Sequence, residues 1–193
     1  MEPPNSSPTL GSQVVELLAA VRRGEPGAAD EIFGLLYPDL RQLAHSRLRR
    51  SGRLTLLDTT SLVHEAYLRL FKAGTLEADD RGQFLAYAAR VMRSVVVDFV
   101  RRRAAERRGG NAPHVGLDEE ANALSDTRER EVMRIDEALE ELAAIDARLV
   151  RVVEMRYFAG MTEDQVADAL GLSRRSVARD WEKARLFLAA ALD

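Results

Sequence analysis

The sequence predicts an all-α protein of two small helical domains that are joined by a flexible acidic linker. Apolar residues recur at helical spacing along most of the chain. The pattern stops at residues 109–113, Gly-Gly-Asn-Ala-Pro, and the residues from there to Asp126 are acidic, turn-rich and poor in large apolar side chains. We therefore expect a disordered terminus, a first domain, a linker and a second domain at residues 1–12, 13–108, 109–127 and 128–193.

Helical segments of the first domain are expected at residues 14–22, 28–36, 39–49, 61–71 and 83–108. The turn Gly24-Glu25-Pro26-Gly27 ends the first of them, and Tyr37-Pro38 marks a break or kink. The last segment has a potential break at Arg93-Ser94. The β-branched run Val95-Val96-Val97 is interpreted as buried helix, because its flanks are rich in alanine and arginine.

The second domain is expected to be helical from Thr127 to the end of the chain. Breaks are expected at residues 144–146 and 159–160 and at Gly171. The segment before Gly171 would bury Val166, Ala167 and Leu170 as a short inner face.

The residues around Gly171 predict a helix-turn-helix within residues 162–188. Thr162 and Gln165 fit a capping box, in which each side chain bonds to the backbone amide of the other residue. Gly171 suits the left-handed position that ends a helix, and Ser173 can cap the next helix. This order of cap, glycine and cap is typical of the motif.

The second helix of this motif would bury four apolar residues and expose an arginine-rich face. The buried residues are Val177, Trp181, Ala184 and Leu188, and the exposed ones are Arg174, Arg175, Ser176, Arg179 and Lys183. In this motif the N-terminal end of the second helix enters the major groove of DNA. Arginine there can bind guanine in a bidentate manner, which discriminates by roughly 1–3 kcal/mol. The alternative is a solvated helical hairpin. The sequence order of cap, glycine, cap and basic face favours the DNA-binding motif over this alternative.

Composition limits the kind of protein further. The 193 residues carry 28 basic and 31 acidic side chains, so the net charge is −3 and argues against non-specific binding of nucleic acid. The chain has no cysteine and three scattered histidines, so we expect no disulfide, metal site or cofactor. No signal peptide or membrane-spanning run is recognisable, and a cytoplasmic protein without a membrane partner is expected.

Three segments in order resemble the sigma-70 type initiation factors of RNA polymerase. Residues 157–162 with Leu170-Gly171-Leu172-Ser173 are similar to sigma domain 4, and residues 62–70 to the polymerase-binding helix of sigma domain 2. Residues 84–93 and 97–102 are similar to the segment that binds the −10 promoter element. Two such domains and a linker are the layout of the extracytoplasmic-function (ECF) group. Met92-Arg93, Val97-Asp98 and residues 107–110 resemble an ECF branch that is linked to serine/threonine kinases.

The resemblance implies a promoter-specificity factor and not an enzyme. Its partners would be core RNA polymerase, through the clamp helices of the largest subunit, and promoter DNA with −35 and −10 elements. A serine/threonine kinase is a candidate partner, and an anti-sigma factor is left open. The competing hypothesis is a two-domain helix-turn-helix regulator that acts without core polymerase. A helical enzyme is disfavoured, because the sequence shows no metal cluster, phosphate-binding glycine loop or nucleophile–base pair.

The resemblance also assigns binding residues. The −35 element would be read by Arg174, Arg175, Ser176 and Arg179, with Lys183 on phosphates. The −10 site would comprise Arg93, Ser94, Asp98, Arg101, Arg102 and Arg103, and would capture a flipped base near Ser94. Polymerase would be bound by Asp58, Leu62, Val63, Glu65 and Tyr67.

Several of these assignments have alternatives. The basic run Arg101–Arg103 can be a solvated helix end. Phe84 and Tyr87 can stack on single-stranded bases, although core positions are favoured for them. Linker acids such as Asp118 and Asp126 can mimic RNA or merely solvate a spacer. Ser94 stands where the common ECF pattern has asparagine, so the base preference does not carry over.

The stretch before the polymerase-binding helix departs most from the ECF pattern. ECF factors have an acidic run there, but this chain has Asp58-Thr59-Thr60-Ser61. A phosphate adds about −1.5 to −2 charges at pH 7 and would restore the missing negative field. We therefore predict phosphorylation at Thr60, Thr59, Ser61 or, less well placed, Thr55. The alternative is that Thr60 or Ser61 caps the helix.

Overall fold

The described part of this computed structural model is almost entirely helical and contains no strand, which confirms the predicted all-α class. The structure describes residues 9–50, 57–72, 76, 78–108 and 119–193. The expected terminus up to residue 8, the linker residues 109–118 and Thr55 therefore lie outside the described residues.

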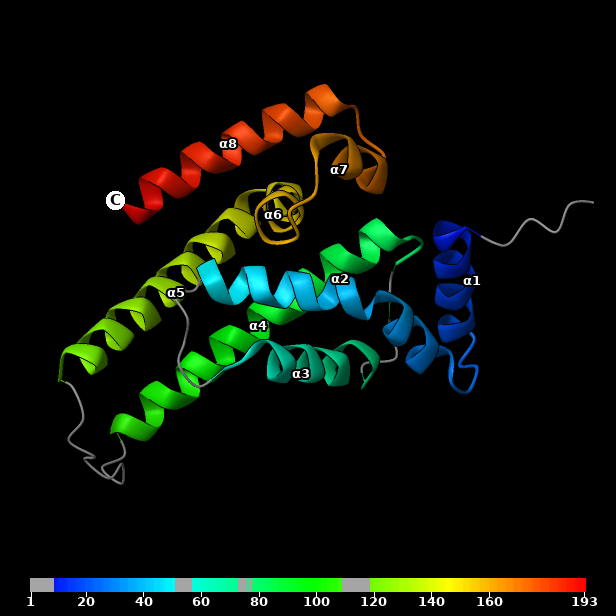
Figure 1. Ribbon diagram of the computed structural model, residues 1–193. Helices are drawn as coiled ribbons and strands as arrows, with labels where there is room; N and C mark the ends of the chain where they lie inside the picture. Colours follow the sequence, from blue (N-terminus) through cyan, green and yellow to red (C-terminus); the bar gives the residue numbers. More distant parts are fainter. Residues whose placement is uncertain (1–8, 51–56, 73–75, 77, 109–118) are drawn as a thin grey trace, which may run out of the picture.

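The N-terminal half is formed by α1 (Leu10–Arg22), α2 (Ala28–Arg50), α3 (Thr59–Lys72) and α4 (Arg81–Arg108). Helix α1 packs on α2, and both α2 and α3 pack on the long helix α4 (Figure 1). Leu36 of α2, Leu62 of α3 and Phe84 of α4 are fully buried between these helices. The run Val95–Val97 is buried helix, as predicted.

Neither Tyr37-Pro38, where a break or kink was expected, nor Arg93-Ser94, where a break was suggested, interrupts its helix. Helix α2 continues through Pro38, because Leu36 and Leu40 on either side are buried and tertiary packing holds the helix together. Helix α4 continues through Arg93-Ser94, where Met92 and Val95 are buried in the same way.

Two helices begin earlier than the sequence suggested. Helix α1 begins at Leu10, inside the segment expected to be disordered, because the Thr9 hydroxyl accepts a hydrogen bond from the Ser12 amide at 3.3 Å and caps the helix. Helix α5 begins at Glu119, inside the expected linker. The helical part of the chain therefore extends into both segments that were expected to be irregular.

The C-terminal half is formed by α5 (Glu119–Ile145), α6 (Ala147–Val153), the π-helical turn η1 (Glu154–Phe158), α7 (Glu163–Leu170) and α8 (Arg174–Leu192). The breaks fall at Asp146, at residues 159–162 and at residues 171–173, close to their predicted places. Helix α8 packs against α5, α6 and α7 (Figure 1).

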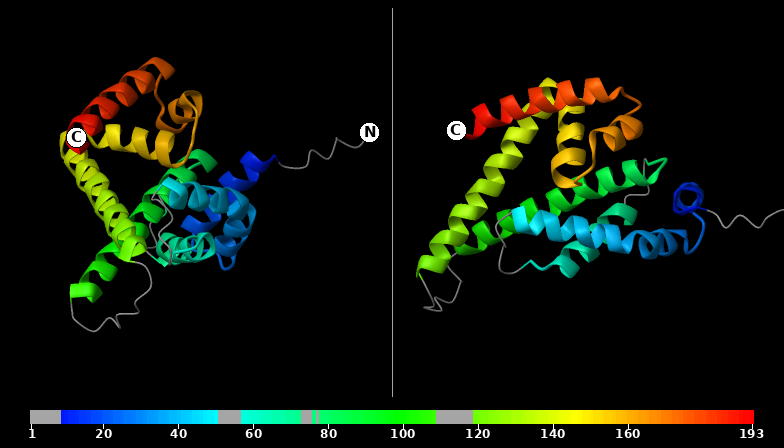
Figure 2. Two further views of the ribbon diagram at one scale, coloured as in Figure 1. Left: turned by 60° about the vertical axis from the view of Figure 1, so that its left-hand side comes forward. Right: turned by 45° about the horizontal axis from the view of Figure 1, so that its top comes forward.

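The two halves pack against each other. Helices α5 and α7 and the turn η1 contact α4, and η1 also contacts α2 (Figure 2). One hydrophobic core extends from α1–α4 to Val132 and Leu139 of α5 and to Phe158 of η1. A smaller core, which includes Val166 and Val177, lies inside the C-terminal half. The sequence predicted two domains joined by a linker and left their packing in the free protein open; the structure places them in contact.

Candidate functional site

The turn between α7 and α8 has the hydrogen bonds that its sequence predicted. The Thr162 hydroxyl accepts from the Gln165 amide at 3.2 Å, and the Gln165 side chain accepts from the Thr162 amide at 2.8 Å, so the capping box is complete. Gly171 has φ 65°, the left-handed conformation that ends α7. The Ser173 hydroxyl accepts from the Ser176 amide at 3.1 Å and begins α8. These contacts fix the direction in which α8 leaves the turn.

The inner faces of α7 and α8 pack partly as predicted, with one addition. Val166, Val177 and Ala184 have no exposed surface, whereas Leu170, Trp181 and Leu188 are half-buried. The addition is Asp180, whose fully buried carboxylate lies 2.8 Å from the guanidinium of Arg148 on α6. No sequence signal separated this aspartate from the polar residues around it.

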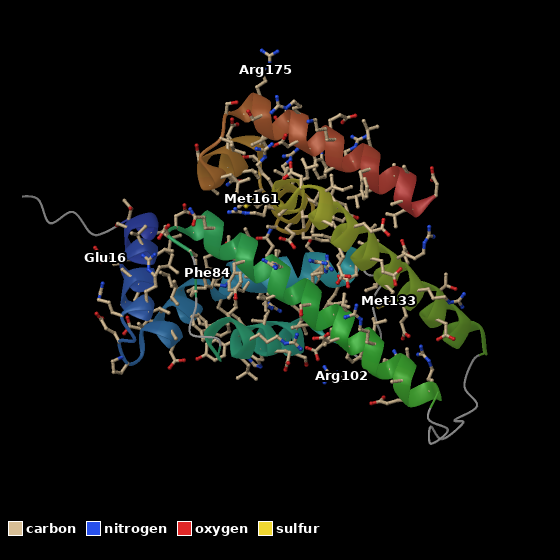
Figure 3. The ribbon with its side chains drawn as sticks, turned by 180° about the vertical axis from the view of Figure 1, so that it is seen from behind. Glu16, Phe84, Arg102, Met133, Met161 and Arg175 are labelled. Atoms are coloured by element: carbon tan, nitrogen blue, oxygen red, sulfur yellow. The ribbon has the colours of Figure 1, made fainter. Side chains whose placement is uncertain are left out.

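The outer face of α8 exposes four cations. Arg174, Arg175, Arg179 and Lys183 are exposed, and Arg175 points away from the rest of the molecule (Figure 3). Arg174 bends back to α7, where Glu163 accepts a hydrogen bond from it at 3.1 Å and raises its pKa. The Ser176 hydroxyl is engaged with Ser173 at 2.9 Å. Arg179 lies 3.7 Å from the carboxylate of Asp180, whereas Arg175 and Lys183 have no ion pair among the described residues.

The N-terminus of α3 is capped by Asp58. Its carboxylate accepts from the amides of Thr60 at 2.8 Å and Ser61 at 3.0 Å, and from the Ser61 hydroxyl at 2.7 Å. The hydrogen bonds from Ser61 and Thr60 lower the pKa of Asp58. The alternative that Thr60 or Ser61 caps the helix is therefore wrong. Thr59 is half-buried and Thr60 is exposed.

The other predicted polymerase-binding residues divide between surface and core. Leu62 and Val63 are buried, so they pack α3 onto the core and are not available on its outer surface. Glu65 is partly exposed. Tyr67 is half-buried, and its hydroxyl donates to Asp30 of α2, which raises the pKa of the tyrosine. Asp58 and Glu65 are thus the surface acids of the predicted set.

The predicted −10 residues point in two directions from α4. Ser94 and Asp98 both accept hydrogen bonds from Arg69 of α3, at 3.1 and 2.6 Å. Arg102 is exposed and points away from the C-terminal half (Figure 3). The structure therefore joins Ser94 to Asp98 through Arg69, a residue that sequence reasoning missed.

Arg93, Arg101 and Arg103 face the opposite way from Ser94 and contact carboxylates of the C-terminal half. Arg93 is therefore on a different side of α4 from Ser94 and Asp98, although the resemblance grouped them as one pocket. Phe84 is fully buried, which confirms its core position, and Tyr87 is half-buried.

The described residues contain no group of three or more His, Asp or Glu side chains that could hold a metal ion. No helix among them is both long enough and apolar enough to cross a membrane.

An all-helical chain with a capped helix-turn-helix and an exposed arginine face has the features of a DNA-binding transcription protein. A family model described as "ECF sigma factor" matches residues 11–193. The chain belongs to the ECF sigma factor family, whose members direct transcription initiation and are not enzymes. A comparison with curated proteins finds no match.

Proposed function

We propose that this chain binds core RNA polymerase and directs it to promoters that have both a −35 and a −10 element. The observation that carries the proposal is the exposed arginine face at the start of α8, which the turn around Gly171 holds outward. Arg175 and Arg179 would read the −35 duplex, and Lys183 would hold a phosphate. The −10 element would bind α4, and the clamp helices of the polymerase would bind α3.

Run-off transcription tests this proposal. Core polymerase is incubated with fragmented genomic DNA, with or without the chain, and the transcripts are mapped. We expect new start sites that depend on the chain and are lost with Arg175→Ala/Arg179→Ala. A chain that neither co-purifies with core polymerase nor adds start sites would contradict the proposal, and binding to DNA without polymerase would favour the competing regulator hypothesis.

We further propose that a serine/threonine kinase activates the chain at Thr60 or Thr59. The hydroxyl would take the γ-phosphoryl group of ATP, lose its proton and release ADP. The support is the position of Thr60, which is exposed in the first turn of α3 and whose hydroxyl has no hydrogen-bond partner among the described residues. Ser61 is a poorer candidate, because its hydroxyl is held by Asp58.

The surface of α3 carries few negative charges, and this explains why a phosphate there would change binding to polymerase. Asp58 and Glu65 are the surface acids of the predicted contact. The carboxylate of Glu65 forms an ion pair with Arg69 at 3.4 Å, which offsets its negative charge. A phosphate would add about −1.5 to −2 charges at the N-terminal end of the helix, where the helix dipole favours an anion. Its oxygens would also suit the arginines of a basic partner surface.

The affinity of core polymerase for four proteins tests the kinase proposal: wild type, Thr60→Glu, Thr59→Glu and Thr60→Gln. We expect at least one glutamate variant to bind about tenfold more tightly than wild type, which corresponds to about 1.4 kcal/mol. Thr60→Gln has the size of the glutamate without its charge and should bind as wild type does. Equal affinity of all four proteins would exclude the switch.

A further inference from the structure

Arginines of α4 meet carboxylates of the C-terminal half in a row. The Arg93 guanidinium lies 2.5 Å from Asp136 of α5 and 3.2 Å from Glu154 of η1. Arg101, two turns further along α4, lies 3.5 Å from the other oxygen of Asp136. One carboxylate therefore bridges two arginines, and the first arginine is shared by two elements of the C-terminal half.

The row continues toward the end of α4. Arg103 lies 3.2 Å from Glu129, and Arg107 contacts Glu129 and lies 3.4 Å from Asp126. These contacts, from Arg93 to Arg107, are called the closing ion pairs below. Arg93, Arg101 and Arg103 belong to the −10 site that the family resemblance assigned. The side chains expected to meet DNA therefore already have anionic partners within the chain.

The carboxylates are well removed from water. The side chains of Asp136, Glu129 and Glu154 are 7%, 4% and 6% exposed, and that of Arg93 is 14% exposed. The side chains of Arg93 and Arg103 are 14% and 22% exposed, so a DNA phosphate cannot reach these guanidinium groups while α5 covers them. Binding of Arg93 or Arg103 to DNA and binding to α5 are therefore mutually exclusive.

The halves also touch at the other end of α4. A Cβ atom placed on Gly82 would lie 3.4 Å from the Cβ of Ala169 on α7 and 3.3 Å from the Met161 side chain. Phe158 of η1 is buried, and the Arg47 guanidinium of α2 lies 3.9 Å from the centre of its ring. The C-terminal half is thus held along α4, with apolar contacts at one end and ion pairs at the other.

We propose that these contacts close the free protein: acidic residues of α5 and η1 occupy the −10-binding arginines of α4 in place of DNA phosphates. This inference rests on the proposed two-element promoter function. Closure is released when the two halves separate on polymerase and promoter. The kinase switch at α3 is a different device, because Thr60 lies on none of the contacting surfaces described above.

The length of promoter DNA supports separation. Elements named −35 and −10 are about 25 base pairs apart, which is roughly 85 Å along B-DNA at about 3.4 Å per pair. Helix α4 has 28 residues and is therefore about 42 Å long. Because α7 touches α4 at Gly82, the closed protein cannot place α8 and the −10 arginines on the two elements together.

The interface also contains charges that would gain water on opening. Arg47 is 5% exposed, and burial, with the nearby charge of Arg93, lowers its pKa to about 9. Burial also raises the pKa of Glu154. Removing charges from water is costly, and an interface built on such pairs is held less firmly than an apolar one of the same size. The closed arrangement is therefore suited to release.

A disulfide lock tests the proposal directly. The chain has no cysteine, and the Cβ separation at Gly82 and Ala169 is close to that of natural disulfides, which is about 3.5–4.5 Å. We expect oxidised Gly82→Cys/Ala169→Cys to lose at least tenfold in transcription with core polymerase, and dithiothreitol to restore it. The single-cysteine variants, which cannot form this link, are the controls. Full transcription by the oxidised protein, with the cross-link verified by mass, would overturn the proposal.

Release of the closing ion pairs is the complementary test. Asp136→Asn/Glu129→Gln, which removes the carboxylates that pair with Arg93, Arg101, Arg103 and Arg107, should increase the radius of gyration in small-angle scattering and raise transcription several-fold at limiting protein. Glu140→Gln is the matched control, because Glu140 is exposed on the same helix and has no ion pair among those described. An unchanged radius of gyration, with helical content preserved, would contradict closure. Scattering does not depend on promoter recognition, so failure of the sigma function itself would be recognised separately.

Discussion

Side chains that are adjacent in sequence have different roles on α4 because of helix geometry. Successive residues of a helix are rotated by about 100°. Arg93 therefore faces buried carboxylates of the C-terminal half, while Ser94 accepts a hydrogen bond from Arg69 on the other side. The sequence motif places Arg93 and Ser94 side by side, and sequence alone does not show that their side chains contact different parts of the protein. The structure thus separates the face of α4 that contacts carboxylates of the C-terminal half from the face that carries Ser94.

The same distinction applies to the cations of α8. Arg175→Ala should weaken binding to the preferred −35 duplex by roughly 1–3 kcal/mol and relax sequence preference, because a bidentate base contact is lost. Lys183→Ala should weaken all sequences equally and reduce the slope of log affinity against log salt by about 1. Fluorescence anisotropy over a salt series measures both effects. Equal loss of specificity in the two variants would contradict the assignment.

At the scale of elements, the α7–α8 turn depends on a backbone conformation that glycine adopts freely. Gly171 has φ 65°, and no atom lies within 4 Å of the place that a Cβ would take, so substitution meets no steric obstacle beyond the backbone. Gly171→Ala should lower the free energy of unfolding by about 1–2 kcal/mol, the cost of the left-handed region for an L-residue.

Gly34 provides the matched control for that substitution. It is exposed inside α2, has open space around it and has no left-handed φ. Gly34→Ala should stabilise by about 0.5–1 kcal/mol, because alanine loses less backbone entropy in a helix. Urea unfolding measures the stability of both variants: a change in the midpoint urea concentration at an unchanged m-value is a change in the free energy of unfolding. A stabilising Gly171→Ala would show that the turn does not need its left-handed residue.

Local elements were predictable from the sequence, and their reasons are local. Thr162, Gly171 and Ser173 interact with residues within a few positions, so their spacing was sufficient to predict the turn. The cap of α3 was misjudged by two positions, because Asp58 and Thr60 are both good capping residues. The contact between halves could not be predicted, since the arginines of α4 and the acids of α5 are separated in sequence and each set reads as a solvated surface.

At the scale of the whole molecule, the two halves form one body around α4. An apolar contact at Gly82 and the closing ion pairs cover Arg93 and Arg103 of α4, whereas Arg101, Arg102 and the arginine face of α8 stay exposed. If these contacts close the free protein as proposed, the arginine face of α8 is open to DNA while Arg93 and Arg103 are covered. This asymmetry predicts that −35 contact and core binding precede −10 contact.

The charges between the halves make stability depend on pH. Glu154 faces Arg93 and Arg90 of α4 and Arg47 of α2, and Asp136 shares Arg93 with it. Burial outweighs these cations and raises its pKa above 4.5. Between 4.5 and the raised pKa the folded state binds more protons than the unfolded state, so the contribution of Glu154 to stability falls as pH rises.

Comparison with Glu154→Gln isolates this contribution. The free energy of unfolding of the wild type minus that of the variant should decrease as pH rises from 4.5 through the raised pKa. Urea unfolding at a series of pH values measures the difference. A difference that grows with pH would mean that the pairing with Arg93 dominates burial.

The distance between the two halves tests the central claim most directly. Glu106 and Arg130 are exposed and lie next to the paired residues Arg107 and Glu129. Spin labels on Glu106→Cys/Arg130→Cys should give one short distance in the free protein. In the complex with core polymerase and promoter DNA, the distance should increase by tens of ångströms as the halves take up the two elements. The same short distance in a transcriptionally active promoter complex would contradict the account.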